Sequence, residues 1–274
     1  MLGQLNLAAK NKIQVAIERL QMFEPPEGYY LAFSGGKDSL TIKVLADMAG
    51  VKYDAHYNIT TADPPELVQY IKKHHKDVDM DSTGTSMWKL IPQKLMPPTR
   101  LVRYCCQELK EHGGYGRTVI TGVRWAESTR RKKTWTVVQP FTKSRPKNGL
   151  SNKELGQKIM LMNDNDERRR MTEQCVAKGK FNVNPILDWS DKDVWEFIDS
   201  NKLQYCELYD EGYKRLGCVG CPISCNKEKE LKRWPKYNVM YLRAFDRMLF
   251  ERKKKGKETT WKTPQDVMDW WLSQ

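Results

Sequence analysis

Six consecutive residues combine the groups that bind a phosphate in proteins: Ser34, Gly35, Gly36, Lys37, Asp38 and Ser39. Two glycines let backbone N–H groups approach an anion closely, and the start of a following helix adds partial positive charge. Lys37 can add a full charge, and Asp38 can hold a magnesium ion or orient a nucleophile. A Ser-capped tight turn is the alternative. The spacing differs from Gly-x-x-x-x-Gly-Lys-Ser/Thr, so the sequence predicts another type of phosphate loop.

Four of the seven cysteines form two pairs, the adjacent Cys105 and Cys106 and the Cys-x-x-Cys pair of Cys218 and Cys221. In a chain that we expect to be cytoplasmic, such pairs favour metal or redox chemistry over disulfides. Four thiolates suit either zinc or an iron–sulfur cluster. Adjacent cysteines are awkward ligands for one tetrahedral zinc but can reach separate irons of a [4Fe-4S] cluster. We therefore favour the cluster, with zinc or buried structural cysteines as alternatives.

The other cysteines have different expected roles. Cys225 follows the Cys-x-x-Cys pair closely and is a candidate replacement ligand or reactive thiol. We expect Cys175 and Cys206 to be unliganded.

An alternation of strands and helices must position these groups. The apolar run 29–33 before the loop predicts a buried strand, and the apolar residues from Leu40 to Leu45 predict a helix after it. Further strands are expected within residues 51–61, 116–123, 135–141 and 181–187, and a helix capped by Ser190 within 190–201. This order predicts an α/β fold with a mostly parallel sheet and helices on both faces. Ligands of such sheets bind at the carboxyl ends of the strands, where the loop lies.

The domain organisation follows from changes in composition along the 274 residues. We expect an N-terminal helix at 1–24, a domain that carries the phosphate loop at 25–215 and a cysteine knuckle with a basic helical C-terminal extension at 216–274. A charged insert is expected at about 143–180. No apolar stretch approaches the roughly 20 residues of a membrane helix, so we expect no membrane partner.

The basic residues are concentrated in two segments of a chain whose formal net charge is +13. Residues 129–147 hold seven Lys or Arg and no acid, and residues 226–262 hold thirteen basic and five acidic residues. These segments are candidate surfaces for DNA or RNA. The alternative is a solvated basic face without a partner.

Several motifs together resemble the phosphoadenosine phosphosulfate (PAPS) reductase family of the N-type ATP pyrophosphatase superfamily. The resemblance covers residues 28–225, and its motifs are SGGKDS, NITTADPPELVQYIKK, RYCCQELK, TGVRWAESTRR, NPILDWSDKDVWEFI and LYDEGYKRLGCVGCP. It implies an adenine nucleotide alpha-hydrolase-like fold that binds ATP or an adenylyl nucleotide with Mg²⁺. Most superfamily members split ATP between the α and β phosphates and form an adenylated intermediate.

The resemblance also implies roles for individual residues. Lys37, Asp38 and Arg124 would be catalytic, with Asp38 as the magnesium ligand. Glu127 is either a second magnesium ligand or the ion-pair partner of an arginine, and Arg124 and Arg130 have the solvated basic face as their alternative. The phosphates would be contacted by Ser34, Gly35, Gly36, Lys37, Asp38, Ser39, Arg124, Ser128 and Arg130. Cys105, Cys106, Cys218 and Cys221 match the cluster-binding set of adenylylsulfate reductases and of DNA phosphorothioation enzymes.

One departure from the family bears on the reaction. Sulfonucleotide reductases carry a nucleophilic cysteine in a C-terminal Glu-Cys-Gly-type tail, and no cysteine follows Cys225 in this sequence. The first hypothesis is therefore an iron–sulfur ATP pyrophosphatase that adenylates a substrate for sulfur transfer, with nucleic acid as a candidate acceptor and a sulfur donor or reductant protein as a candidate partner. The alternatives are a sulfite-forming PAPS or adenylylsulfate reductase that uses Cys225 or an external thiol, and a non-catalytic nucleotide-binding regulatory module.

Overall fold

The structure is a computed structural model that describes residues 11–111, 113–114, 116–141 and 180–274. Residues 143–179 of the predicted insert, Cys175 among them, lie outside the described residues. The first ten residues of the predicted N-terminal helix also lie outside the described residues. In the described remainder of that segment, residues 12–22 are helical.

A six-stranded sheet in the order β3-β2-β1-β4-β6-β5 forms the centre of the fold. Its strands are β1 (Tyr29–Ala32), β2 (Tyr53–Asn58), β3 (Val78–Asp81), β4 (Thr118–Ile120), β5 (Val138–Phe141) and β6 (Lys180–Val183). β1 pairs in parallel with β2 and β4, β4 pairs in parallel with β6, and β5 is antiparallel to β6. The prediction of a mostly parallel α/β sheet is confirmed.

The helices differ widely in length, and α11 is the longest described one at 20 residues. They are α1 (Lys12–Met22), α2 (Lys37–Ala49), α3 (Pro65–His74), α4 (Met87–Lys94), α5 (Tyr104–Leu109), α6 (Thr129–Thr134), α9 (Asp191–Ser200), α10 (Lys227–Arg233), α11 (Pro235–Lys254) and α12 (Pro264–Ser273), with 3-10 turns η1 (Trp125–Glu127) and η2 (Glu207–Tyr209). Across the described residues, no helix is both long and apolar enough to cross a membrane.

The chain divides into two compact units, each made of several stretches. Over the described residues, the sheet unit lies within the ranges 1–57, 74–79 and 113–206, and the helical unit lies within the ranges 58–73, 80–112 and 207–274. The domain boundaries expected at 24/25 and 215/216 stay predictions.

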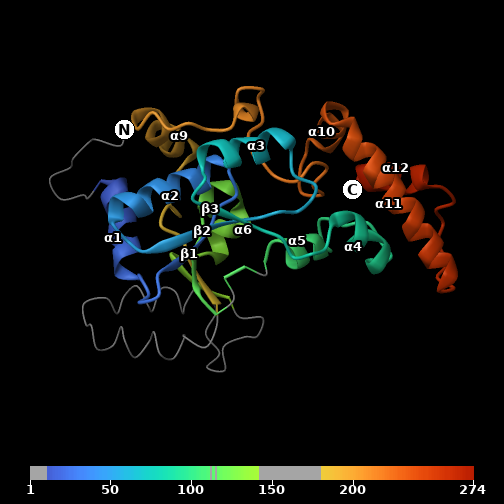
Figure 1. The fold of residues 1–274 in the computed structure, drawn as a ribbon, viewed down its shortest axis with the longest axis horizontal. Coiled ribbons are helices and arrows are strands. Elements are labelled where there is room, and N and C mark those ends of the chain that lie inside the picture. The colour runs from blue at the N-terminus through green and yellow to red at the C-terminus, as the bar shows by residue number, and fades with distance from the viewer. Residues whose placement is uncertain (1–10, 112, 115, 142–179) are drawn as a thin grey trace. The chain divides into compact units, whose positions relative to one another are not determined.

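In the sheet unit, α1, α2 and α9 lie side by side (Figure 1). α1 turns Ala16 and Leu20 into the core, and the buried hydroxyl of Tyr29 donates a hydrogen bond of 2.7 Å to the Leu20 carbonyl. This bond joins α1 to the first residue of β1 and satisfies a polar group that would otherwise be costly to bury. The strand that leads into the phosphate loop is thus joined to α1, and its residues Tyr29, Tyr30 and Leu31 are buried.

The sheet order places a topological switch point between β1 and β4. From β1 the chain continues to β2 and β3 on one side, while β4 and β6 lie on the other side. Where the connections from two neighbouring strands run in opposite directions, a crevice forms at the carboxyl ends of those strands. Open α/β sheets bind their ligands in this crevice. The loops after β1, β4 and β6 are therefore the segments that position the site.

In the helical unit, α11 packs against both α4 and α12 (Figure 1). Trp271 of α12 is fully buried, with its ring 4.6 Å from that of Tyr241 and 5.7 Å from that of Phe245. Its indole N–H donates to the Pro98 carbonyl at 2.7 Å. Because buried aromatic rings contribute large apolar areas, this cluster holds the basic C-terminal helices in a defined arrangement.

A buried histidine lies next to the phosphate loop in the sheet unit. The ring of His75 is 4.7 Å from that of Phe33, and the residue is only 9% exposed. Burial, assisted by the charge of Lys43, lowers the pKa of His75 from 6.5 to about 4. The folded state therefore holds this imidazole neutral at pH values where the unfolded chain protonates it.

We predict that His75 makes the folded protein less stable in mild acid. Since its pKa is lower in the folded state, its contribution to stability is complete above pH 6.5 and is lost as the pH falls toward 4. The free energy of unfolding should fall by about 1 kcal/mol per pH unit more in the wild type than in His75→Gln over this window. Urea titrations at several pH values measure the two slopes, and parallel slopes would contradict the prediction.

Candidate functional site

The predicted phosphate loop connects β1 to α2, as expected. Gly35 has a φ of 71°, a left-handed conformation that favours glycine, and Gly36 is the N-cap of α2. Ser39 donates to the Gly36 carbonyl at 2.9 Å, and the hydroxyls of Ser34 and Ser39 are 3.1 Å apart. Ser34 is exposed, whereas Gly35, Gly36 and Ser39 are buried. The loop thus ends on the first backbone N–H groups of α2, which is the arrangement that binds anions.

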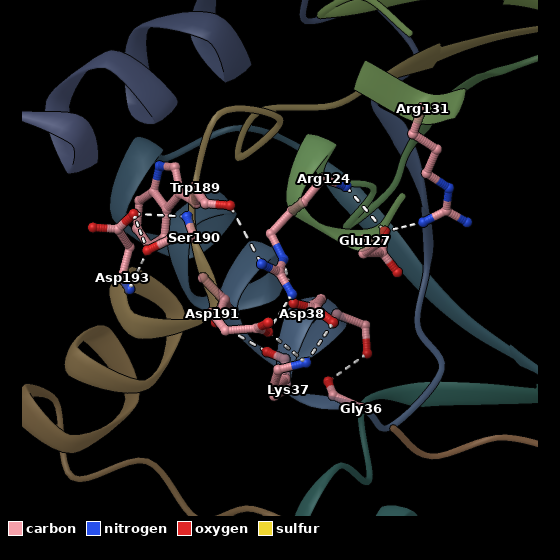
Figure 2. Close-up of polar contacts among 12 residues, drawn as sticks. Gly36, Lys37, Asp38, Arg124, Glu127, Arg131, Trp189, Ser190, Asp191 and Asp193 are labelled. Carbon is pink, nitrogen blue, oxygen red and sulfur yellow. Dashed lines mark hydrogen bonds and ion pairs between the residues drawn. The ribbon is translucent and has the colours of Figure 1, made fainter. Parts of the chain in front are cut away.

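Two cations and two carboxylates meet at the start of α2 (Figure 2). The buried Lys37 ammonium lies 3.3 Å from Asp38 Oδ2 and 3.4 Å from Asp191 Oδ1. Arg124 donates from Nε to Asp38 Oδ1 at 2.7 Å and from Nη2 to Asp191 Oδ1 at 2.8 Å. The four side chains come from the ends of the β1–α2, β4–η1 and β6–α9 connections, so three strands supply one cluster.

Arg124 is the most buried charge of this cluster. It is 1% exposed, and its Nη1 donates a third hydrogen bond, of 3.3 Å, to the Trp189 carbonyl. A buried guanidinium is stable only when its donors are paired. The structure therefore places Arg124 in the site and not on the solvated basic face that was its alternative.

Asp191 is a site residue that the sequence reasoning missed. The sequence predicts a capped helix at 190–201 within the motif NPILDWSDKDVWEFI but assigns no role to Asp191. The structure confirms Ser190 as the N-cap, with its hydroxyl accepting from the Asp193 N–H at 3.2 Å. Asp191 is the first residue of α9 and follows β6, so its position at the carboxyl end of a strand was the available signal. Burial opposes its ionisation, but the Arg124 hydrogen bond and the nearby charges of Arg124 and Lys37 hold the pKa of Asp191 below its usual range.

Gly122 sets how closely the β4 connection approaches α2. A Cβ atom at this position would lie 2.9 Å from both the backbone carbon and the Cβ of Asp38. Such distances are shorter than real Cβ contacts, so a side chain at residue 122 would displace the backbone of Asp38. Glycine here lets Arg124 reach the phosphate loop.

The remaining residues of the arginine element lie outside this cluster. Ser128 is the N-cap of α6 and accepts from the Arg131 N–H at 3.2 Å, and Arg130 is exposed on the same helix. Their predicted contacts with phosphate stay predictions. Glu127 accepts from the Arg124 N–H at 3.1 Å and forms an ion pair with Arg131 (Figure 2). This agrees with the ion-pair interpretation of Glu127.

The paired cysteines all belong to the helical unit. Cys105 and Cys106 lie in the first turn of α5, and the Cys221 N–H donates to the Cys218 carbonyl at 3.1 Å to form a tight turn. The thiol of Cys218 donates to Thr60 Oγ1 at 3.3 Å. Val219, inside the turn, donates to the Ala62 carbonyl at 2.7 Å and accepts from the Tyr241 hydroxyl at 2.9 Å. The Cys-x-x-Cys turn is therefore attached to two other segments of its unit.

The four thiols influence one another electrostatically. The hydrogen bond between the adjacent thiols lowers the pKa of Cys106. The same bond and burial raise the pKa of Cys105, and the charges of Cys218 and Cys221 raise it further. The pKa of Lys110 is raised, mainly by the charge of Cys218. Within the residues that the structure describes, no three His, Cys, Asp or Glu side chains are arranged to hold a metal ion. Cys225 is exposed.

Comparison with known proteins gives a family match over most of the chain. The model of the phosphoadenosine phosphosulfate reductase domain matches residues 28–224. An uncharacterised protein of Methanocaldococcus jannaschii is 28% identical over 208 residues, which are 72% of this chain and 42% of the relative. Adenosine 5'-phosphosulfate reductase of Neisseria meningitidis is 36% identical over 64 residues, which are 23% of this chain and 26% of that enzyme. The chain thus spans less than half the length of these relatives.

Solved structures show weaker likenesses. A phosphoadenylyl-sulfate reductase of Candida auris, in a phosphate complex, is 16% identical with a TM-score of 0.46, over 79% of this chain and 98% of that one. A U34-tRNA thiolase of Methanococcus maripaludis, with its [4Fe-4S] cluster, is 9% identical with a TM-score of 0.34, over 91% of this chain and 80% of that one. These likenesses are too weak to bear on function.

We predict that Asp191 competes with anionic ligands for Lys37 and Arg124. Asp191→Asn removes one negative charge from the cluster, so inorganic pyrophosphate should bind about threefold to tenfold more tightly in the absence of magnesium. Isothermal titration calorimetry measures this affinity. Asp188→Asn is the matched control, because it makes the same change in net charge at a carboxylate that pairs with Arg19 at 2.6 Å instead. Equal affinities in the two variants, or weaker binding in Asp191→Asn, would contradict the prediction.

Proposed function

Because the chain belongs to the phosphoadenosine phosphosulfate reductase domain family, we propose that it is an enzyme of ATP pyrophosphatase type that adenylates a substrate for sulfur transfer. The observation that carries this proposal is the cluster of Lys37, Asp38, Arg124 and Asp191 at the switch point of the sheet. It combines helix N–H groups, two buried cations and two carboxylates, which are the groups that a nucleotide triphosphate and its metal ion require.

The proposed reaction begins with the phosphates of ATP against the first turn of α2. The phosphates replace Asp191 as the partner of Lys37 and Arg124, because the cations can pair with only one set of anions. An oxygen of the acceptor then attacks the α-phosphorus, the bond from that phosphorus to the bridging oxygen breaks, and pyrophosphate leaves while the acceptor proton passes to solvent. Lys37 and Arg124 stabilise the charge that develops on the phosphate oxygens, since both are held in place beforehand. A sulfur nucleophile displaces AMP in a second step.

Magnesium fits the carboxylates of this cluster. Asp38 and Asp191 supply the oxygen donors that Mg²⁺ prefers, and both border Lys37. When bound, the ion would neutralise phosphate charge. The two carboxylates balance Lys37 and Arg124, so the four side chains carry no net charge, which supports a requirement for the metal ion in triphosphate binding.

In number and chemical type, although not in their arrangement in this structure, the four paired thiols of the helical unit match the ligands of an iron–sulfur cluster. Cys105, Cys106, Cys218 and Cys221 perturb one another electrostatically, and four thiolates are the usual ligands of [4Fe-4S]. Such a cluster would supply sulfur binding or electron transfer. Lys110 interacts electrostatically with three of these sulfurs, those of Cys106, Cys218 and Cys221, and its positive charge would stabilise their thiolate forms.

Pyrophosphate release from ATP tests the proposed activity. We expect magnesium-dependent release in the presence of candidate acceptors, and a loss of at least about 100-fold in Lys37→Gln and Asp38→Ala. The first variant removes a cation that contacts the phosphates, and the second removes the magnesium ligand that also holds Arg124 in place. Asp47→Asn is the control, since Asp47 is exposed near the other end of α2. Sulfite release from adenylylsulfate without ATP, lost in Cys225→Ser, would contradict the proposal and favour the reductase.

Metal analysis after anaerobic purification tests the cluster separately. We predict about four irons and four sulfides per chain, the content of one [4Fe-4S] cluster, and a large loss of iron in Cys218→Ser and Cys106→Ser. Cys206→Ser, at a buried cysteine of the sheet unit, should keep its iron. One zinc per chain and no iron would show that the four thiols serve as a zinc site.

A further inference from the structure

The outward face of α11 carries a continuous stripe of basic and apolar side chains. Its residues follow one another at intervals of three or four and therefore share one side of the helix. They are Lys236, Met240, Arg243, Arg247, Phe250 and Lys254, called here the α11 stripe. At 1.5 Å per residue the stripe is about 27 Å long. It therefore spans several nucleotides of an extended strand.

The stripe is separate from the packing face of the helix. The opposite side of α11 buries Tyr241, Ala244, Phe245 and Met248 in the core of the helical unit. By contrast, Phe250 is 68% exposed. Packing within the unit does not explain why an aromatic ring stands among the cations of this face.

A hollow of about 500 Å³ opens beside the stripe. It is lined by Trp88, Met240, Arg243, Asp246 and Arg247. The Arg247 guanidinium donates to the Trp88 carbonyl at 3.4 Å, which joins α11 to α4 at this place. The hollow thus combines apolar surface with two guanidinium groups and one carboxylate, and its volume is in the range of small-ligand sites.

Three cations of the stripe, Lys236, Arg243 and Lys254, differ from Arg252, which also lies in the basic C-terminal segment. Arg247 resembles Arg252 in donating to backbone carbonyls, those of Trp88 and Arg243. Arg252 donates to the carbonyls of Leu95 and Glu258, each at 2.7 Å, and its guanidinium lies 5.6 Å from the Trp261 ring centre. It therefore holds the loop after α11 in place. Among the described residues, the four cations of the stripe form no salt bridge, whereas Arg233 of α10 pairs with both Glu66 and Glu211.

We propose that the α11 stripe and its hollow bind single-stranded nucleic acid. Lys236, Arg243, Arg247 and Lys254 would contact successive phosphates, and Phe250 would stack on a base. The hollow would receive an unstacked base, whose amino group can donate to Asp246. A duplex does not present free base faces to such a groove, and a uniformly anionic membrane surface offers no partner for the carboxylate.

This inference names an acceptor class for the proposed function, but its test needs neither ATP nor turnover. Fluorescence anisotropy with labelled 20-nucleotide single-stranded DNA, the same sequence as RNA, and a duplex measures the affinity of the full chain. We expect the double variant Arg243→Gln/Arg247→Gln to bind single strands about tenfold more weakly and to reduce the magnitude of the salt slope by about 1.4, as loss of two phosphate contacts requires. Phe250→Ala should weaken single-strand binding and leave duplex binding unchanged.

The matched control is Lys232→Gln/Lys262→Gln, which removes the same charge at two exposed residues outside the stripe. It should bind within about twofold of the wild type, because a general charge effect is small compared with lost contacts. Equal losses in the two double variants would overturn the proposal, as would no binding of single strands by the wild type at about 100 mM salt. Binding that anionic vesicles or polyglutamate abolish, without preference for nucleic acid, would also overturn it. Failure of the pyrophosphate assay alone would leave it standing.

Discussion

The buried guanidinium of Arg124 is the interaction on which the site depends. With 1% exposure, this charge would be costly to bury if its donors were unpaired, and it bonds to Asp38, Asp191 and the Trp189 carbonyl. These acceptors belong to the segments after β1 and β6, and Arg124 itself follows β4. One side chain therefore joins the carboxyl ends of three neighbouring parallel strands, where the sheet order creates a crevice.

The same cluster explains how one site can be both buried and able to exchange partners. Lys37 and Asp38 are at the first turn of α2, whose N–H groups are fixed by the helix, while the Asp191 side chain is 67% exposed. The exposed carboxylate can leave the cations without exposing apolar core. A polyanion can thus replace it while Arg124 keeps its bonds to Asp38 and Trp189. Arg124 thus has two fixed acceptors, Asp38 and the Trp189 carbonyl, and one replaceable acceptor, Asp191.

The sequence was informative wherever local pattern and chemistry coincide. The strand–loop–helix around residues 29–49, the parallel sheet and the Ser190 cap follow from apolar runs, glycines and capping residues that act over short distances. Asp191 was missed because its role depends on Arg124, 67 positions away. Arg252 is hydrogen-bonded within its unit, whereas Arg243 lies on an exposed face. This difference likewise depends on tertiary packing, which a count of charges does not contain. The antiparallel pairing of β5 with β6 is a further feature that depends on tertiary packing.

Gly122 has a consequence for how this site can change over evolution or in the laboratory. Since even a methyl group at this position would strike the backbone of Asp38, residue 122 cannot gain a side chain unless the phosphate loop moves. A change in the lining of this cluster must therefore come from other positions of the three connections. One residue without a side chain thereby fixes how closely the β4 connection and the start of α2 can pack, whatever the neighbouring positions become.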